Sequence, residues 1–170
     1  MTYLQEALDY GLVKAGLALS VAQVGGVVGR IAWGYVSDRW LGACRALALL
    51  AGLMAISTLA TALVHAQVPP LLVFTLLIVF GASAIGWNGV YLAEVARRAP
   101  PGMASMATGG TLAVTFFGTV LGPALFAALA ALGGSYRAGF DALAIPTALC
   151  FLILVRKDSA ELRGPGRAPG

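Results

Sequence analysis

The sequence predicts an all-α, polytopic membrane protein, a bundle of five transmembrane helices. Hydrophobic residues make up 59% of the 170 residues and charged residues only 11%, whereas soluble domains carry about 25% charged residues. Five apolar stretches have about the 20 residues that a membrane-spanning helix needs. The basic residues collect in the segments between these stretches, which is typical of membrane topology and not of a nucleic-acid-binding patch. We therefore expect the lipid bilayer, and no nucleic acid, as the environment of this chain.

Prolines, glycines and charged residues separate the five expected spans. The spans are predicted at residues 15–36, 46–63, 71–95, 105–132 and 137–155. Pro69-Pro70 precedes the third span, the Ala-Pro-Pro-Gly sequence at 99–102 follows it, and Gly133-Gly134 ends the fourth. These are residues that favour turns over continued helix.

The domain organisation follows from these spans. Residues 1–14 are expected to form an extracytoplasmic N-terminal segment and residues 15–155 a five-span domain. Residues 156–170, which are polar and rich in glycine and proline, are expected to form a disordered cytoplasmic tail.

The distribution of basic residues predicts the orientation of the chain. Eight lie on one side (Arg39, Arg45, Arg97, Arg98, Arg156, Lys157, Arg163 and Arg167) and two on the other (Lys14 and Arg137). Because cytoplasmic loops carry the excess of lysine and arginine, the N-terminus is predicted outside and the C-terminus in the cytoplasm. Abundant alanine, glycine and arginine indicate a GC-rich bacterial genome, and hence the bacterial inner (plasma) membrane.

The loop between the first two spans contains an unusual set of residues. Gly34, three residues, Asp38-Arg39, and then Gly42 and Arg45 resemble the signature loop of the major facilitator superfamily. In that family a second glycine follows Asp-Arg after one residue, and basic residues come next. Here Leu41 stands in the place of that glycine, Gly42 comes one residue later, and Arg45 alone represents the basic cluster.

Independently of the resemblance, these residues can form a conformational latch. Asp38 can accept hydrogen bonds from the N-terminus of a neighbouring helix, and Arg39 or Arg45 can pair with an acid on another helix. Glu94 is the candidate acid, because it lies near the cytoplasmic boundary, where an unpaired acid is costly. Arg30, Arg39 or Arg98 can pair with it. The alternatives are a solvated loop for Asp38-Arg39 and a simple Glu94–Arg98 surface pair.

A second group of residues forms a candidate substrate pathway. Ser20, Gln23 and Arg30 share one face of the first span. Trp87 and Asn88 place an indole beside an amide, a combination that orients polar ligands well. Thr111 and Thr115 offer hydroxyl groups near the middle of the fourth span. They also belong to a stripe of small residues from Ser105 to Gly122, for which close packing between helices is the default interpretation.

The resemblance implies a function. The chain is similar to the eighth to twelfth helices of the twelve-helix fold, which implies secondary active transport of a small molecule by alternating access. The family also implies a coupling proton, although no acid lies at mid-membrane here. Either the chain is a truncated product or fragment that lacks its N-terminal half, or it works with a partner membrane protein. The alternative is a non-transporting membrane subunit or scaffold. The sequence has no catalytic constellation, metal-ligand set or cofactor motif, so no enzyme, metal or cofactor is expected.

Overall fold

A computed structural model describes residues 4–5, 10–65 and 67–163, and these residues contain helices and no strands. Five helices are long and apolar enough to cross a membrane, which confirms the predicted fold class. They are α2 (Leu12–Val36), α3 (Ala43–Leu63), α4 (Pro70–Arg98), α5 (Ala104–Leu132) and α6 (Tyr136–Arg163), with a π-helical turn, η1 (Ser37–Leu41), after α2.

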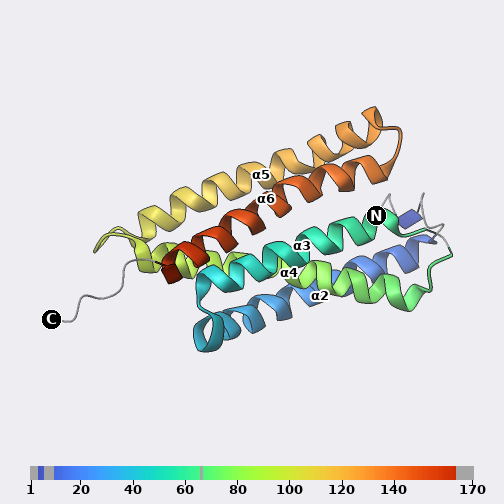
Figure 1. Cartoon of the computed structure of the whole chain (residues 1–170). Helices are drawn as coiled ribbons and strands as arrows, with labels where there is room; N and C mark the ends of the chain where they lie inside the picture. The colour runs from blue at the N-terminus through green and yellow to red at the C-terminus, as the bar shows by residue number, and fades with distance from the viewer. Residues whose placement is uncertain (1–3, 6–9, 66, 164–170) are drawn as a thin grey trace.

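The helices lie side by side, and their connections alternate between two ends of the bundle (Figure 1). The α2–α3 and α4–α5 connections share one end with the end of α6, and the α3–α4 and α5–α6 connections share the other (Figure 1). We call the first the basic end, because Arg39, Arg45, Arg97, Arg98, Arg156 and Lys157 lie in or beside these segments.

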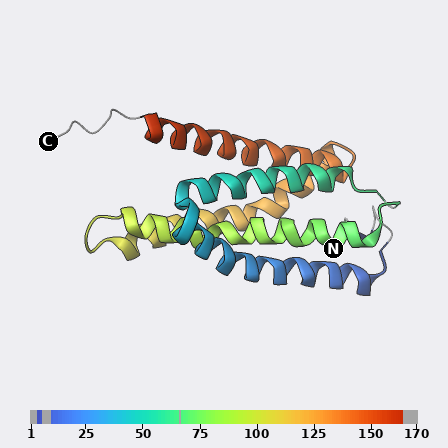
Figure 2. The same ribbon diagram turned by 60° about the horizontal axis from the view of Figure 1, so that its bottom comes forward.

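The helices differ in how much they contact one another. The most extensive contacts are those of α2 with α4 and of α3 with α6, followed by α3 with α4. Helix α5 makes smaller contacts with α4 and α6. The view in Figure 2 shows the same order, with α3 between α6 and α4 and with α2 on the far side of α4.

Glycines bring α2 and α4 into backbone contact. A Cβ atom at Gly25 would lie 2.9 Å from the carbonyl oxygen of Ile78, and one at Gly29 would lie 2.6 Å from that of Ala82. From the other side, a Cβ at Gly81 would overlap the carbonyl of Ala22. Gly25 and Gly29 have the four-residue spacing that lets two membrane helices approach closely. This interface was not predicted from the sequence.

The small-residue stripe of α5 does not form the packing contact expected of it. None of the residues of α5 is buried, and a Cβ at Gly118 or Gly122 would meet nothing within 4 Å. The two glycines therefore have no helix packed against them within the described part of the chain, whereas Thr111 and Thr115 of the same stripe line a groove shared with α4. Spacing of small residues permits close approach, but it does not create a partner helix.

Helix α6 extends beyond its predicted end. The fifth span was predicted to end at Val155 and to be followed by a disordered tail from residue 156, but the helix continues to Arg163. Arginine and lysine are good helix formers, and an ion pair of Asp158 with α3, described below, ties this extension to the bundle. The rest of the predicted tail, residues 164–170, lies outside the described residues, as do residues 1–3 and 6–9 of the predicted N-terminal segment. Helix α2 begins at Leu12, within the expected 1–14 segment.

Candidate functional site at the basic end

The signature loop folds as a short turn between α2 and α3. Residues Ser37–Leu41 continue the helix as η1, and Gly42 ends it with φ of 75°, in the left-handed region that favours glycine. The displaced glycine is therefore needed for the backbone conformation of this turn. Gly34, by contrast, lies within α2, and a Cβ atom at this position would meet nothing within 4 Å. The described residues therefore impose no steric requirement for glycine at this position.

The first ion-pair group links this turn to the end of α4. Arg97 Nη1 lies 3.4 Å from Asp38 Oδ1, and Arg97 Nε lies 3.3 Å from Glu94 Oε2. Arg98 Nε donates to the other oxygen of Glu94. Asp38 thus pairs with an arginine side chain and not, as predicted, with the N-terminus of a neighbouring helix. Glu94 pairs with two arginines of its own helix.

The second ion pair joins the start of α3 to the extension of α6. Arg45 Nε lies 3.0 Å from Oδ1 and 3.1 Å from Oδ2 of Asp158. Beside it, the Cys44 thiol lies 3.8 Å from the carbonyl oxygen of Leu154. Arg45 therefore pairs with an acid on another helix, as the sequence suggested, and the acid is Asp158.

The two groups meet at one cavity. A cavity of about 330 Å³ is lined by residues of both groups and of the turn: Leu41, Gly42, Ala43, Cys44, Arg45, Glu94, Arg98 and Asp158. We call Asp38, Arg45, Glu94, Arg97, Arg98 and Asp158 the charge cluster. It connects η1, α3, α4 and α6 at the basic end.

Each of these ion pairs contributes little stability on its own. The side chains of Arg97 and Asp38 are 53% and 67% exposed, and those of Arg45 and Asp158 are 47% and 26% exposed. Exposed pairs of this kind contribute about 0–1 kcal/mol each. Such contacts can be broken and remade during a conformational change, whereas the glycine contact of α2 and α4 cannot be broken so easily.

Two residues assigned to the latch stand apart from the cluster. No ion pair includes Arg30 or Arg39 in the part of the chain that the structure describes. Arg30 lies on α2, well before the turn, and does not reach Glu94. Arg97 and Asp158, in contrast, were not among the predicted site residues. The i,i+3 spacing of Arg97 from Glu94 was a usable signal, but nothing local marked Asp158.

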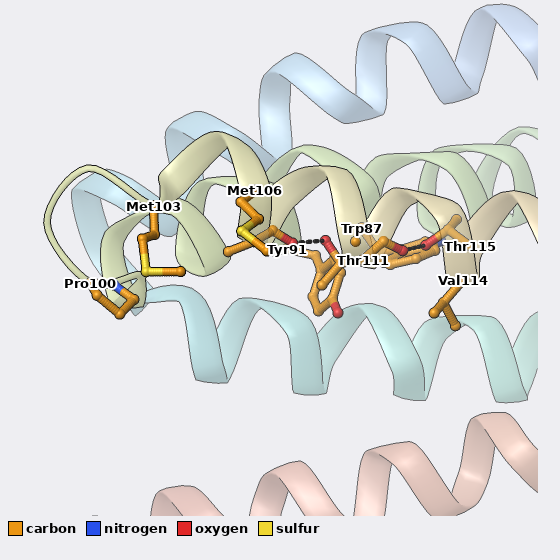
Figure 3. Close-up of a pocket in the computed structure, with 10 residues that line it drawn as sticks. Trp87, Tyr91, Pro100, Met103, Met106, Thr111, Val114 and Thr115 are labelled. Carbon is orange, nitrogen blue, oxygen red and sulfur yellow. Dashed lines mark hydrogen bonds between the residues drawn. The ribbon is translucent and has the colours of Figure 1, made fainter.

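Three of the predicted pathway residues line a common groove between α4 and α5. The groove has a volume of about 620 Å³ and is lined by Trp87, Tyr91, Pro100, Met103, Met106, Ala107, Gly110, Thr111, Val114 and Thr115. Figure 3 shows the two aromatic side chains of α4 beside the threonines of α5. The rings of Trp87 and Tyr91 pack with their centroids 5.5 Å apart. No charged side chain is among the described residues that line the groove.

The threonine hydroxyls of this groove are already engaged. Thr111 donates to the carbonyl oxygen of Ala107, and Thr115 donates to that of Thr111 (Figure 3). Thr111 also donates to the carbonyl oxygen of Thr108. Each oxygen still has a lone pair free to accept a hydrogen bond. The groove therefore offers apolar surface with a few acceptors.

Gln23 and Asn88 lie away from this groove. Gln23 is exposed on α2, and Asn88 is half-buried on α4. The Oδ1 atom of Asn88 is buried and has no hydrogen-bond partner among the described residues. Of the predicted pathway residues, Trp87, Thr111 and Thr115 thus line the groove, whereas Gln23 and Asn88 lie outside it.

Comparison with known proteins identifies the family. The family model described as Major Facilitator Superfamily matches residues 1–170. The chain belongs to the major facilitator superfamily. It is therefore a multi-pass integral membrane protein, in agreement with its five apolar helices.

One relative of the chain is a benzoate transport protein of Acinetobacter baylyi (strain ATCC 33305 / BD413 / ADP1). It is 30% identical over 140 residues, which cover 82% of this chain and 29% of the relative. The chain thus spans less than a third of the length of this relative. No solved structure matches the chain.

Proposed function

We propose that this chain is the C-terminal part of a secondary active transporter that moves a small molecule by alternating access. The family match and the relative, a transport protein, support this proposal. In such transporters, one group of helices rocks against another around a central substrate site. The helices described here supply one of these groups, and the remaining helices come from an N-terminal half or from a partner membrane protein.

The observation that carries the proposal is the charge cluster. It joins the ends of four helical segments at the basic end, around the loop that resembles the family signature. Weak ion pairs at the ends of helices suit a latch that holds one transport state and releases it. By the excess of basic residues, this end faces the cytoplasm and the C-terminus lies inside. Gly42 shapes the turn and Arg39 lies in it, so both are part of the proposed latch, whereas Gly34 precedes the turn within α2.

The substrates to test first are small carboxylates, because the 30% identical relative is a benzoate transport protein. The groove between α4 and α5 offers aromatic and methionine side chains, which suit an apolar ring. A coupling proton is part of the proposal by family membership.

The test is uptake by the full product of the gene, reconstituted in liposomes. A panel of labelled sugars, amino acids and carboxylates finds the substrate. Asp38→Asn removes the charge of Asp38 at nearly constant shape, and it is expected to abolish uptake while membrane insertion stays normal. Full uptake by Asp38→Asn would remove the latch from the proposal, and no uptake by the wild type of any compound would remove transport.

A non-transporting subunit or scaffold is the second candidate. The open face of α5 favours it, because this helix has no buried residue within the described chain. Co-purification of the chain with a larger membrane protein, together with no uptake by the complex, is the outcome that this candidate predicts.

A further inference from the structure

Arg30 is the most deeply placed charged residue of the described helices. Helix α2 and the turn η1 form one apolar segment, Leu12–Leu41. Arg30 lies about 16 Å along the axis from Leu41 and farther still from Leu12, at a rise of 1.5 Å per residue. A charged side chain at such depth is costly unless it is paired, and in membrane proteins it usually marks a substrate or ion pathway.

No acid of the described chain neutralises Arg30. Asp38 and Glu94 pair with arginines at the end of α4, Asp158 pairs with Arg45, and Asp141 pairs with Arg137. All four acids whose side chains the structure describes therefore have other partners. Arg30 is exposed, and its charge is available to an anion from outside these helices.

The side chain of Arg30 lies against α4 at Gly89, next to Asn88 in the chain. Its Cγ atom would be 3.2 Å from a Cβ at Gly89, so glycine at this position leaves room for the arginine stem. Asn88 is the preceding residue, and its buried Oδ1 has no hydrogen-bond partner among the described residues. Because an amide can turn over and exchange its oxygen with its NH₂ group, Asn88 can present either an acceptor or a donor.

Asn88 lies on the side of α4 that faces away from α3. Val90 packs against Ala43, Ala46 and Leu50 of α3. Asn88 is two residues away, or about 200° around the helix, and therefore faces away from α3. Gln23 shares the face of Arg30 on α2, seven residues earlier, which adds a second amide along the same side.

We propose that Arg30 binds the carboxylate group of the transported substrate, with Asn88 as a hydrogen-bonding neighbour. The proposal rests on the transport function proposed above and replaces the latch role assigned to Arg30 from the sequence. A guanidinium group matches a carboxylate with two parallel hydrogen bonds and neutralises one negative charge. The site therefore selects small monocarboxylates over neutral compounds of the same shape.

The first experiment uses the full gene product, purified in detergent, and needs no variant. Benzoate and benzamide share a ring, but only benzoate carries a charge. Benzoate is expected to raise the thermal midpoint of unfolding, because a ligand that binds only the folded state stabilises it, and benzamide is expected to leave the midpoint unchanged. An equal effect of both compounds, or no effect of benzoate, would overturn the proposal.

The second experiment compares uptake of benzoate by variants in liposomes. Loss of a charge-assisted pair in Arg30→Gln is expected to raise KM about 10- to 100-fold. Arg30→Lys keeps the charge but loses the two-point geometry, so its KM is expected to lie between those of Arg30→Gln and the wild type. Arg156→Gln, which removes an exposed arginine at the basic end, is the matched control with an unchanged KM.

The outcomes separate this proposal from the one on which it rests. An unchanged KM in Arg30→Gln, or a lower maximal rate at unchanged KM, would mean that Arg30 pairs with an acid elsewhere in the protein. Uptake of sugars or amino acids but not benzoate by the wild type would overturn the carboxylate site and leave transport standing. If the wild type moves no compound at all, transport itself fails.

Discussion

Helices α4 and α5 have the same length in the structure and similar apolar composition, yet they are held in different ways. Helix α4 is in backbone contact with α2 through Gly25, Gly29 and Gly81, and it buries Val90 against α3. Helix α5 has no buried residue and exposes large side chains such as Phe116 and Phe117. Because both are hydrophobic enough to span a membrane, apolar composition places a helix in the bilayer, but shape complementarity fixes its neighbours.

This difference divides the chain into a firm part and an adjustable part. We expect helices α2 and α4 to move as one unit along their glycine contact, whereas the Asp38–Arg97 pair at the basic end can open and close between the turn η1 and the end of α4. Helix α5 is the element that can shift, or that needs cover from lipid or from the rest of the protein. Substitutions in the two parts are expected to differ accordingly.

The largest loss of stability is expected from a substitution in the contact between α2 and α4. Gly29→Ala places a methyl group against the Ala82 carbonyl, which forces the helices apart and costs about 3 kcal/mol. Gly118→Ala is the matched control, because its methyl group meets nothing within 4 Å and alanine favours a helix by about 1 kcal/mol over glycine. The thermal midpoints of unfolding of the two variants are compared in detergent. Equal midpoints would mean that the backbone contact does not exist.

Truncation of aromatic side chains is expected to show the same contrast between α4 and α5, with smaller losses of stability. Trp87 packs against the cluster of Ala43, Ala46, Leu50 and Val90, so Trp87→Ala costs about 2 kcal/mol, less than full burial would. Phe117 is 68% exposed, and Phe117→Ala is expected to stay within about 0.5 kcal/mol. If Phe117→Ala is as destabilising in the full gene product, the open face of α5 is packed against another part of that protein.

The smallest loss of stability is expected from a change in the Arg45–Asp158 ion pair between α3 and α6. Arg45→Asp places two acids together and is expected to lower stability by about 1 kcal/mol. The double variant Arg45→Asp/Asp158→Arg restores opposite charges and is expected to recover most of the loss. The measurement is the free energy of unfolding of Arg45→Asp, Asp158→Arg and the double variant. A double variant no better than the worse single variant would argue against the pair.

Much of the fold could be predicted because each membrane helix is recognisable from its own apolar sequence. Their apolar length and the breakers at Pro69-Pro70, 99–102 and Gly133-Gly134 indicated the five spans and most of their ends. The end of α6 could not be placed because Arg156, Lys157 and Asp158 are polar, and the ion pair of Asp158 with Arg45, which ties this part of the helix to α3, is not visible in the sequence.

Contacts between helices were harder to predict. Gly25-Gly29 and Gly118-Gly122 have the same spacing, but only the first pair meets a neighbouring helix among the described residues. Likewise, Arg45 and Asp158 are 113 residues apart, and no local pattern connects them. Sequence identified residue types that suit a latch, and the three-dimensional arrangement decided which of them pair.

The most direct test of the division into two parts is a distance measurement by pulsed electron paramagnetic resonance. Spin labels on Ile31 of α2 and Ala93 of α4, both exposed, report on the firm pair; labels on Ile31 and Val114 of α5 report on the adjustable helix. Cys44 and Cys150 are first replaced by serine. On addition of a transported substrate, the Ile31–Ala93 distance is expected to stay constant and the Ile31–Val114 distance to change. A shift of the Ile31–Ala93 distance as large as that of Ile31–Val114 would contradict the account.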